Sequence, residues 1–223
     1  MPAITQTRQK ATRPPRWERR KESRHAELID AALELFVARG YDATRLEDIA
    51  ARAGVSKGTL YLYFAGKEDL FKALVSETIV PLIQSFGEGI TRSRAPSDEL
   101  LRRFFFGWWS KVGATKLSGI AKMMVAEAHN FPDMARFFQK EVITPASQVL
   151  AAILERGIAR GEFRPLDVEV AVNLWMAPIA LKAIWSHSIG PCCASELTIE
   201  PDRFLSAHLE FVLRALAPGR TPL

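Results

Sequence analysis

The sequence predicts an all-α protein of about nine helices, with a small N-terminal domain followed by a larger helical domain. Three observations support this fold class. Apolar residues recur at the three- and four-residue spacing of a buried helix face along most of the chain. No segment shows the alternation of apolar and polar residues that is typical of a half-buried strand. Residues that start or stop helices, mainly Ser, Asp, Pro and Gly, separate the periodic segments.

The composition is that of an ordinary globular protein. Of 223 residues, 48% are hydrophobic and 25% are charged, which excludes wholesale disorder. The two cysteines, Cys192 and Cys193, are adjacent, so we expect no disulfide framework, and a reducing cytoplasm is the expected location. The basic N-terminus is not followed by the apolar core of a signal peptide. Residues 168–185 are apolar but interrupted by polar residues and a proline, so we expect no membrane span.

The positive charge is concentrated at the N-terminus. Residues 1–24 contain eight basic and two acidic side chains, while the whole chain has a net charge of only +5. Residues 1–20 also contain three prolines and little apolar pattern, which predicts a disordered basic arm. Such an arm either binds a polyanion, most often nucleic acid, or only increases solubility.

The helices of the N-terminal domain, expected at residues 21–72, have recognisable ends. The first is expected from Ser23 to Gly40. Thr44 and Glu47 fit a capping box that starts a second, short helix ending at Gly54. Ser56 is expected to cap a third, and a fourth is expected from Lys67 to about Gly87.

The second domain, expected at residues 73–223, consists of the rest of that fourth helix and five more. Proline and acidic residues mark the helix starts, and a bend is expected at Pro145, inside the longest helix. The expected helices span about 96–112, 116–129, 131–161, 167–187 and 201–217.

Residues 44–64 have the pattern of a helix-turn-helix. Gly54 allows a sharp turn between two short helices, and Ala50 is small where these helices must cross. Val55 and Leu60 provide the apolar contacts that fix the crossing. In this arrangement the second helix is free to enter the major groove of DNA.

A resemblance to a known family strengthens this interpretation. Residues 24–72 resemble the DNA-binding domain of tetracycline-repressor (TetR) family regulators. The matching residues are Ala32, Leu35, Phe36, Gly40, Tyr41, Thr44, Asp48–Ala50, Ala53–Tyr61, Tyr63, Phe64, Lys67, Glu68 and Leu70. The resemblance implies that the chain binds double-stranded DNA and is not an enzyme.

Eight residues are the candidate DNA contacts. They are Thr44, Arg45, Lys57, Gly58, Thr59, Tyr61, Tyr63 and Lys67. Gly58 would let the helix approach base edges closely, and Thr59 offers a methyl and a hydroxyl group. The lysines, the tyrosine hydroxyls and the pair at positions 44 and 45 suit phosphates.

Several of these candidates have structural alternatives. Thr44 could serve only as a helix cap, Tyr61 could belong partly to the core, and Lys67 could be a solvated lysine. We expect Leu62 and Phe64 to pack rather than to read DNA.

Aromatic residues are concentrated in the second domain. Residues 104–138 contain eight of them, which indicates either a well-filled helical core or an apolar pocket between helices. The candidate pocket residues are Phe105, Trp109, Met123, His129, Phe131 and Trp175. An apolar or aromatic effector is the ligand that such a pocket would take.

The last two helices are apolar over more than one face. Either both faces are buried within one chain, or one face contacts a second copy. The TetR resemblance implies the second alternative, a homodimer through residues 167–187 and 201–217.

These features together predict a ligand-responsive, sequence-specific DNA-binding regulator, with repression as the expected direction. Its partners would be a palindromic operator, a small effector and a second copy of the chain, without a cofactor, metal or membrane. The alternative is a constitutive or architectural DNA-binding protein without a small ligand. An enzyme is disfavoured because the sequence lacks nucleophile-elbow, phosphate-loop, dinucleotide-binding and zinc-protease motifs.

Overall fold

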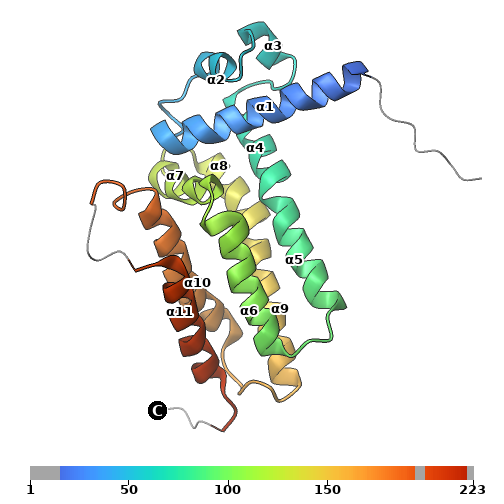
Figure 1. Ribbon diagram of the computed structural model, residues 1–223, viewed down its shortest axis with the longest axis vertical. Helices are drawn as coiled ribbons and strands as arrows, with labels where there is room; N and C mark the ends of the chain where they lie inside the picture. Colours follow the sequence, from blue (N-terminus) through green and yellow to red (C-terminus); the bar gives the residue numbers. More distant parts are fainter. Residues whose placement is uncertain (1–15, 194–198, 220–223) are drawn as a thin grey trace, which may run out of the picture.

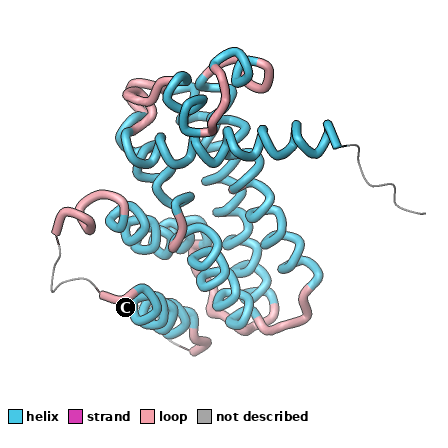
Figure 2. The backbone as a smooth tube through the Cα atoms, turned by 45° about the horizontal axis from the view of Figure 1, so that its top comes forward, coloured by secondary structure: helices cyan, strands magenta, loops and turns pink. Residues whose placement is uncertain are grey.

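The computed structural model describes residues 16–193 and 199–219, and these residues form helices joined by loops (Figure 2). The all-α class is confirmed, and within the described ranges there are nine helices when bent helices are counted once. The N-terminal helices are α1 (Arg16–Arg39), α2 (Leu46–Arg52), α3 (Lys57–Tyr61) and α4 (Lys67–Thr78). The remaining α-helices are α5 (Val80–Arg92), α6 (Ser97–Trp108), α7 (Gly119–Glu127), α8 (Pro132–Phe138), α9 (Thr144–Ala159), α10 (Val168–Ser186) and α11 (Pro201–Leu216).

The first helix begins earlier than its sequence predicts. α1 starts at Arg16, whereas Ser23 was the expected cap, and the Ser23 hydroxyl instead donates to the Glu27 carboxylate at 2.9 Å. The last five residues of the expected arm, 16–20, are therefore helical. Its first fifteen residues lie outside the described part of the chain.

Two long helices are irregular next to a proline, and one of these positions, Pro145, is where the sequence predicts a bend. The α4–α5 helix is interrupted at Ile79, two residues before Pro81, which has no N–H to donate to the preceding turn. Before Pro145 the helix widens into a π-helical turn, η3 (Gln139–Ile143), which connects α8 to α9. A second π-helical turn, η1 (Trp109–Gly113), and a 3₁₀ turn, η2 (Lys116–Ser118), connect α6 to α7.

The helices form a bundle with the short helices at one end. Figure 1 shows α1 lying across the top of the bundle, with α2 and α3 above it and α4–α5 descending beside α6 and α9. One core cluster combines residues of α1 to α4 with Ile120, Met123 and Met134 of the second domain. The expected domain boundary at residue 72 falls inside α4, and this shared core crosses it.

Candidate nucleic-acid interface and apolar cavity

The turn between α2 and α3 forms as the sequence predicts. Gly54 has φ +66°, a conformation that favours glycine, and Val55 N–H donates to Ala50 C=O at 2.9 Å. Ala50 and Leu60 are buried, and the Ser56 hydroxyl caps α3 by accepting from Thr59 N–H at 3.1 Å. This packing directs the opposite face of α3 outward at the end of the molecule (Figure 1).

Lys57 lies on the exposed face of α3 and is already paired with an acid. Its ammonium forms an ion pair with the Glu47 carboxylate of α2, and it lies 5.9 Å from the centroid of the Tyr61 ring. The hydrogen bond that Lys57 donates to the Glu47 carboxylate raises the pKa of Lys57, and the same bond lowers the pKa of Glu47. Both side chains are exposed, so a phosphate can replace the carboxylate.

Gly58 and Thr59 differ in how far they are engaged in contacts within the chain. A Cβ at Gly58 would lie 3.8 Å from Ser56 Oγ, an ordinary contact, so packing within the chain does not require glycine there. The Thr59 hydroxyl is 2.9 Å from the Ser56 hydroxyl, so it is partly engaged in the cap. The open surface at Gly58 suits close approach by another molecule.

The end of α3 presents an apolar side chain that the sequence interpretation missed. Phe64 is buried as expected, but Leu62 is 83% exposed, so its expected packing role is wrong. Leu60 and Phe64 both point inward, which places residue 62 on the opposite face, and this spacing was the available signal. Tyr61 is exposed, whereas Tyr63 is half-buried, with its ring centroid 6.0 Å from that of His25.

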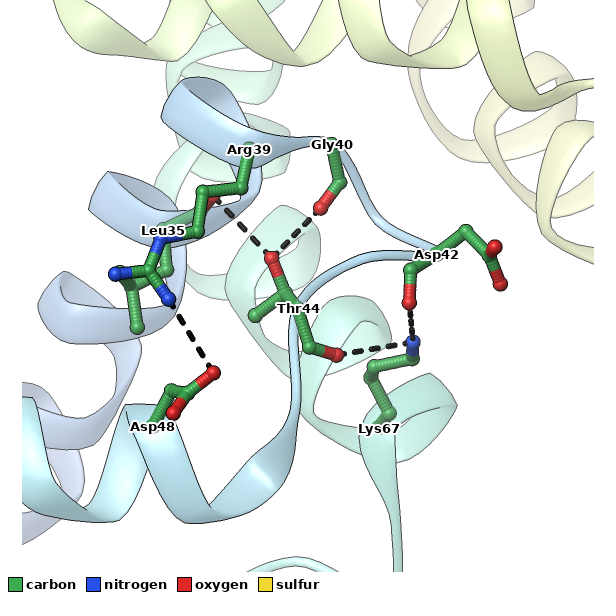
Figure 3. A network of polar contacts seen from close by, with 7 residues as sticks. All are labelled: Leu35, Arg39, Gly40, Asp42, Thr44, Asp48 and Lys67. Atoms are coloured by element: carbon green, nitrogen blue, oxygen red, sulfur yellow. Dashed lines mark hydrogen bonds and ion pairs between the residues drawn. The ribbon is translucent and has the colours of Figure 1, made fainter.

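Thr44 is neither a helix cap nor an available phosphate contact. Its side chain is 1% exposed, and its hydroxyl lies 2.6 Å from Gly40 C=O and 3.3 Å from Leu35 C=O (Figure 3). The cap position of α2 is occupied by exposed Arg45, which makes no side-chain cap bond. The expected capping box therefore does not form, because the hydroxyl fastens the α1–α2 turn to the end of α1.

Lys67 is a structural lysine rather than a phosphate contact or a solvated side chain. Its Nζ donates to the carbonyls of Tyr41, Asp42 and Thr44 at 2.7, 3.1 and 3.1 Å, which uses all three ammonium protons. Figure 3 shows the bonds to Asp42 and Thr44. It also lies 4.5 Å from the centroid of the Tyr41 ring. Burial lowers the pKa of Lys67. The first residue of α4 thus holds the turn that precedes α2 by hydrogen bonds to its backbone.

The six predicted effector contacts do not surround one cavity. Phe105, Trp109 and Trp175 belong to the core around α6, α9, α10 and α11. Met123 and Phe131 belong to the core shared with the N-terminal helices, and His129 is exposed. The aromatic excess is therefore mostly filled core, because helices on both sides of these rings pack against them.

An apolar cavity of about 80 Å³ lies instead between α5, α7, α9 and α10. Among the described residues, Ser118 supplies its single hydroxyl, and no lining side chain is charged. The lining residues are Ile79, Leu82, Ile83, Phe86, Trp108, Val112, Leu117, Ser118, Ala121, Phe138, Val142, Ala146, Ala180 and Ala183. Trp108, the neighbour of the predicted Trp109, is the aromatic residue of α6 that faces this space.

The outer faces of α10 and α11 are apolar and exposed in a single chain. Leu174 of α10 is 64% exposed and Phe211 of α11 is 76% exposed, and Val170, Leu181 and Trp185 are also exposed. Two segments, α10 and Pro132–Ala159, are long and apolar enough to cross a membrane. This is only weak evidence for a membrane-spanning helix, because core helices of soluble proteins have the same length and composition.

Both parts of the chain match families of known proteins. Residues 28–74 match the N-terminal domain of bacterial regulatory proteins of the tetR family, and residues 99–191 match a tetracyclin repressor-like C-terminal domain. Together these matches cover more than half of the chain. The chain belongs to the TetR family. TetR-family regulators bind operator DNA, act as dimers and are not enzymes.

Individual relatives agree with this assignment. The chain is 29% identical to the fatty acid metabolism regulator protein of Bacillus subtilis, over 69% of this chain and 78% of that protein. It is 27% identical to the HTH-type transcriptional repressor KstR2 of Rhodococcus jostii, over 84% of this chain and 94% of that protein. The crystal structure of FadR from Bacillus subtilis in complex with stearoyl-CoA has the same fold, with a TM-score of 0.70 and 24% identity over 86% of this chain and 99% of that one.

Proposed function

We propose that this TetR-family protein is a ligand-responsive repressor, whose dimer binds a palindromic operator and releases it when a small apolar molecule fills the cavity. The position of Ile79 carries the proposal. Ile79 lines the cavity and occupies the break between α4 and α5. At the other end of α4, Lys67 grips the turn that leads into α2. A change in the cavity therefore has a direct mechanical connection to the helix-turn-helix.

On the DNA side, the exposed residues of α2 and α3 are the proposed contacts. Arg45 and Lys57 suit phosphates, and Gly58 allows the helix to approach the bases. Tyr61 and Leu62 present exposed apolar surface, which suits thymine methyl groups and sugars. Thr59 and Tyr63 are partly buried and contribute from the edge of this surface. Thr44 and Lys67 act by holding α2 and α4 in place.

The effector is proposed to be apolar because the cavity lining is apolar. Names of relatives support this class: the FadR structure contains stearoyl-CoA, KstR2 is described as a ketosteroid regulator, and another solved relative as a flavonoid-responsive regulator. An engineered protein cavity that binds benzene has a volume of about 150 Å³. At about 80 Å³, the present cavity must widen for an effector of that size or larger.

Widening of the cavity would move α5 and α10, two helices that we connect with DNA binding. The cavity walls include α5, which continues α4, and Ala180 and Ala183 of α10. An effector shifts the equilibrium only if it binds the widened conformation better, and a coupling of about 1–3 kcal/mol gives a 5- to 150-fold loss of operator affinity. We propose that the displaced α4 changes the distance between the two recognition helices α3.

The proposed dimer uses the exposed apolar faces of α10 and α11, within residues 167–187 and 201–217. Burying side chains such as Leu174 and Phe211 against a second copy would remove large apolar surfaces from water. The same burial accounts for the apolar character of α10 without a membrane. We propose that the protein acts in the cytoplasm, as TetR-family regulators do.

Operator titration tests the proposed function. The operator is first selected from random DNA, and its affinity is then measured with and without an apolar compound that raises the melting temperature of the protein. A loss of affinity of fivefold or more supports the proposal. If a bound compound leaves operator affinity unchanged, induction through this cavity is wrong, and the constitutive DNA-binding alternative is favoured.

A further inference from the structure

The apolar cavity contains one buried hydroxyl, that of Ser118. The Ser118 side chain is buried, and its Oγ lies 2.9 Å from Gly113 C=O, 2.9 Å from Thr115 C=O and 2.8 Å from Nε2 of His187. Ser118 ends η2, while His187 directly follows α10. This contact joins two walls of the cavity at its polar end.

The carbonyls restrict the donor of each bond, because a carbonyl oxygen can only accept. A serine hydroxyl has one proton, so it can donate to only one of its neighbours at a time. While it donates to a carbonyl, the bond to His187 is made by an Nε2–H that donates to Ser118 Oγ. Such donation polarises the hydroxyl and strengthens the bond that it donates.

From its bond to Thr115 C=O, the hydroxyl can turn toward a ligand at small cost. Thr115 C=O also accepts from the backbone N–H of Ser118, at 3.3 Å. This carbonyl therefore keeps a partner when the hydroxyl turns away from it.

The charge of the lining limits which ligand can use this hydroxyl. No lining residue is acidic or basic in the described part of the chain. An anionic or cationic group in the cavity would lose its hydration without gaining a counter-ion from the lining, which is strongly unfavourable, and the His187 imidazole lies behind the lining with its Nε2 already bonded to Ser118 Oγ. An uncharged oxygen loses much less and gains the hydroxyl as a donor.

We infer that Ser118, supported by His187, recognises an uncharged acceptor oxygen on the effector, such as a ketone or ester carbonyl. The cavity thereby selects neutral oxygen-bearing molecules over hydrocarbons and over carboxylates of similar size. This inference rests on the cavity being the effector site, as proposed above.

Three probes of similar size test the inference by isothermal titration calorimetry: acetophenone, ethylbenzene and benzoate. In the unmodified protein we expect acetophenone to bind about fivefold more tightly than ethylbenzene, the factor that corresponds to one hydrogen bond. Benzoate is expected not to bind. Ser118→Ala should remove the preference for acetophenone and leave ethylbenzene affinity unchanged. Ser110→Ala, at an exposed serine whose hydroxyl donates to Gly107 C=O, is the matched control.

A second measurement does not depend on how well a variant folds. The ring-nitrogen resonances of His187 should report the Nε2-protonated tautomer, and they should shift with acetophenone but not with ethylbenzene. Equal affinities of the unmodified protein for acetophenone and ethylbenzene, tight binding of benzoate, or an equal loss of both neutral ligands in Ser118→Ala would each overturn the inference. These outcomes are independent of operator affinity, so they are distinguishable from failure of the proposed repressor function.

Discussion

At the residue scale, Lys67 is a charged side chain that stabilises the fold. Its ammonium is the donor for three carbonyls of one turn. Lys67→Met keeps most of the side chain's length but leaves these carbonyls without that donor, so we expect the free energy of unfolding to fall by about 1–3 kcal/mol. Urea denaturation measures this change. Lys72→Met, which removes an exposed pair with Glu68 and a contact of 5.8 Å with the centroid of the Phe137 ring, is the control and should cost clearly less than Lys67→Met. Equal effects of the two substitutions would show that Lys67 is merely a surface lysine.

The role that we propose for Lys57 is the opposite, because its charge would be available to DNA once the ion pair with Glu47 breaks. Lys57→Ala should weaken operator binding and make its salt dependence shallower by about one unit. Glu47→Gln should strengthen operator binding, since it removes both the competing partner and a negative charge from the DNA-facing surface. Fluorescence anisotropy titrations at several salt concentrations measure both effects. Weaker binding by Glu47→Gln would mean that the ion pair positions Lys57 instead of competing for it.

At the element scale, the crossing of α7 over α1 depends on the absence of a side chain. A Cβ on Gly119 would lie 2.4 Å from Val37 Cγ1, so α7 could not remain in place. Gly119→Ala should therefore destabilise the protein by about 1–3 kcal/mol through overpacking. Val37→Ala makes room for the added methyl group. The double variant Gly119→Ala, Val37→Ala should therefore lose less stability than the sum of the losses in the two single variants.

A second glycine provides the control for helix propensity. Gly89 lies within α5 with nothing within 4 Å of its Cβ position, and Gly89→Ala should stabilise the protein by about 0.5–1 kcal/mol. Thermal unfolding of the four variants distinguishes the crossing from propensity. If Gly119→Ala also stabilises the protein, the close contact with Val37 is not a constraint.

His208 joins three helices and makes their packing sensitive to pH. Its ring stacks on Phe204, meets Phe105 edge-on, and has Nε2 2.9 Å from Trp175 C=O, and burial lowers its pKa. A depressed pKa means that the unfolded chain binds the proton more readily. The stability due to neutral His208 is therefore fully present above about pH 6.5 and is lost as pH falls through the folded-state pKa. Unfolding free energies from pH 5 to 8 should show this slope, and the slope should be smaller in His208→Gln.

Helix positions were predictable from the sequence because they depend on local pattern. Gly40 and Gly54 both have positive φ, and Ser56 caps α3, as their neighbours in sequence indicate. The role of Lys67 was not predictable, because its ammonium binds a turn that lies 23 to 26 positions away in sequence. The partners of the Thr44 hydroxyl, Gly40 and Leu35, are nearer in sequence, but the Thr44 and Glu47 pattern fits a helix cap equally well. The cavity was misplaced because its position depends on how helices distant in sequence pack: Trp108 lines it, whereas the neighbouring Trp109 is buried in the core around α6, α9, α10 and α11.

At the scale of the whole molecule, one chain combines three features: the proposed recognition helix α3, the apolar cavity and the exposed apolar faces of α10 and α11. α4–α5 connects the first two, and α10 belongs to the last two because it lines the cavity with Ala180 and exposes Leu181 on its outer side. Effector binding can therefore act on both the angle of α4 and the packing between subunits. We therefore propose that dimer formation is part of the switch.

A test of the dimer follows from the exposed faces of α10 and α11. One helix-turn-helix reads only a few base pairs, so two recognition helices must be about 34–36 Å apart to occupy successive half-sites. Charge at the centre of an apolar interface is strongly unfavourable, so the double variant Leu174→Asp, Phe211→Asp should sediment as a monomer at micromolar concentration and bind the operator far more weakly. Val125→Asp, at a 72% exposed residue of α7, is the matched control and should leave both properties unchanged. If the double variant remains dimeric while the control becomes a monomer, the subunits meet through α7 and not through α10 and α11, and the proposed spacing of the recognition helices would have to be derived from that surface instead.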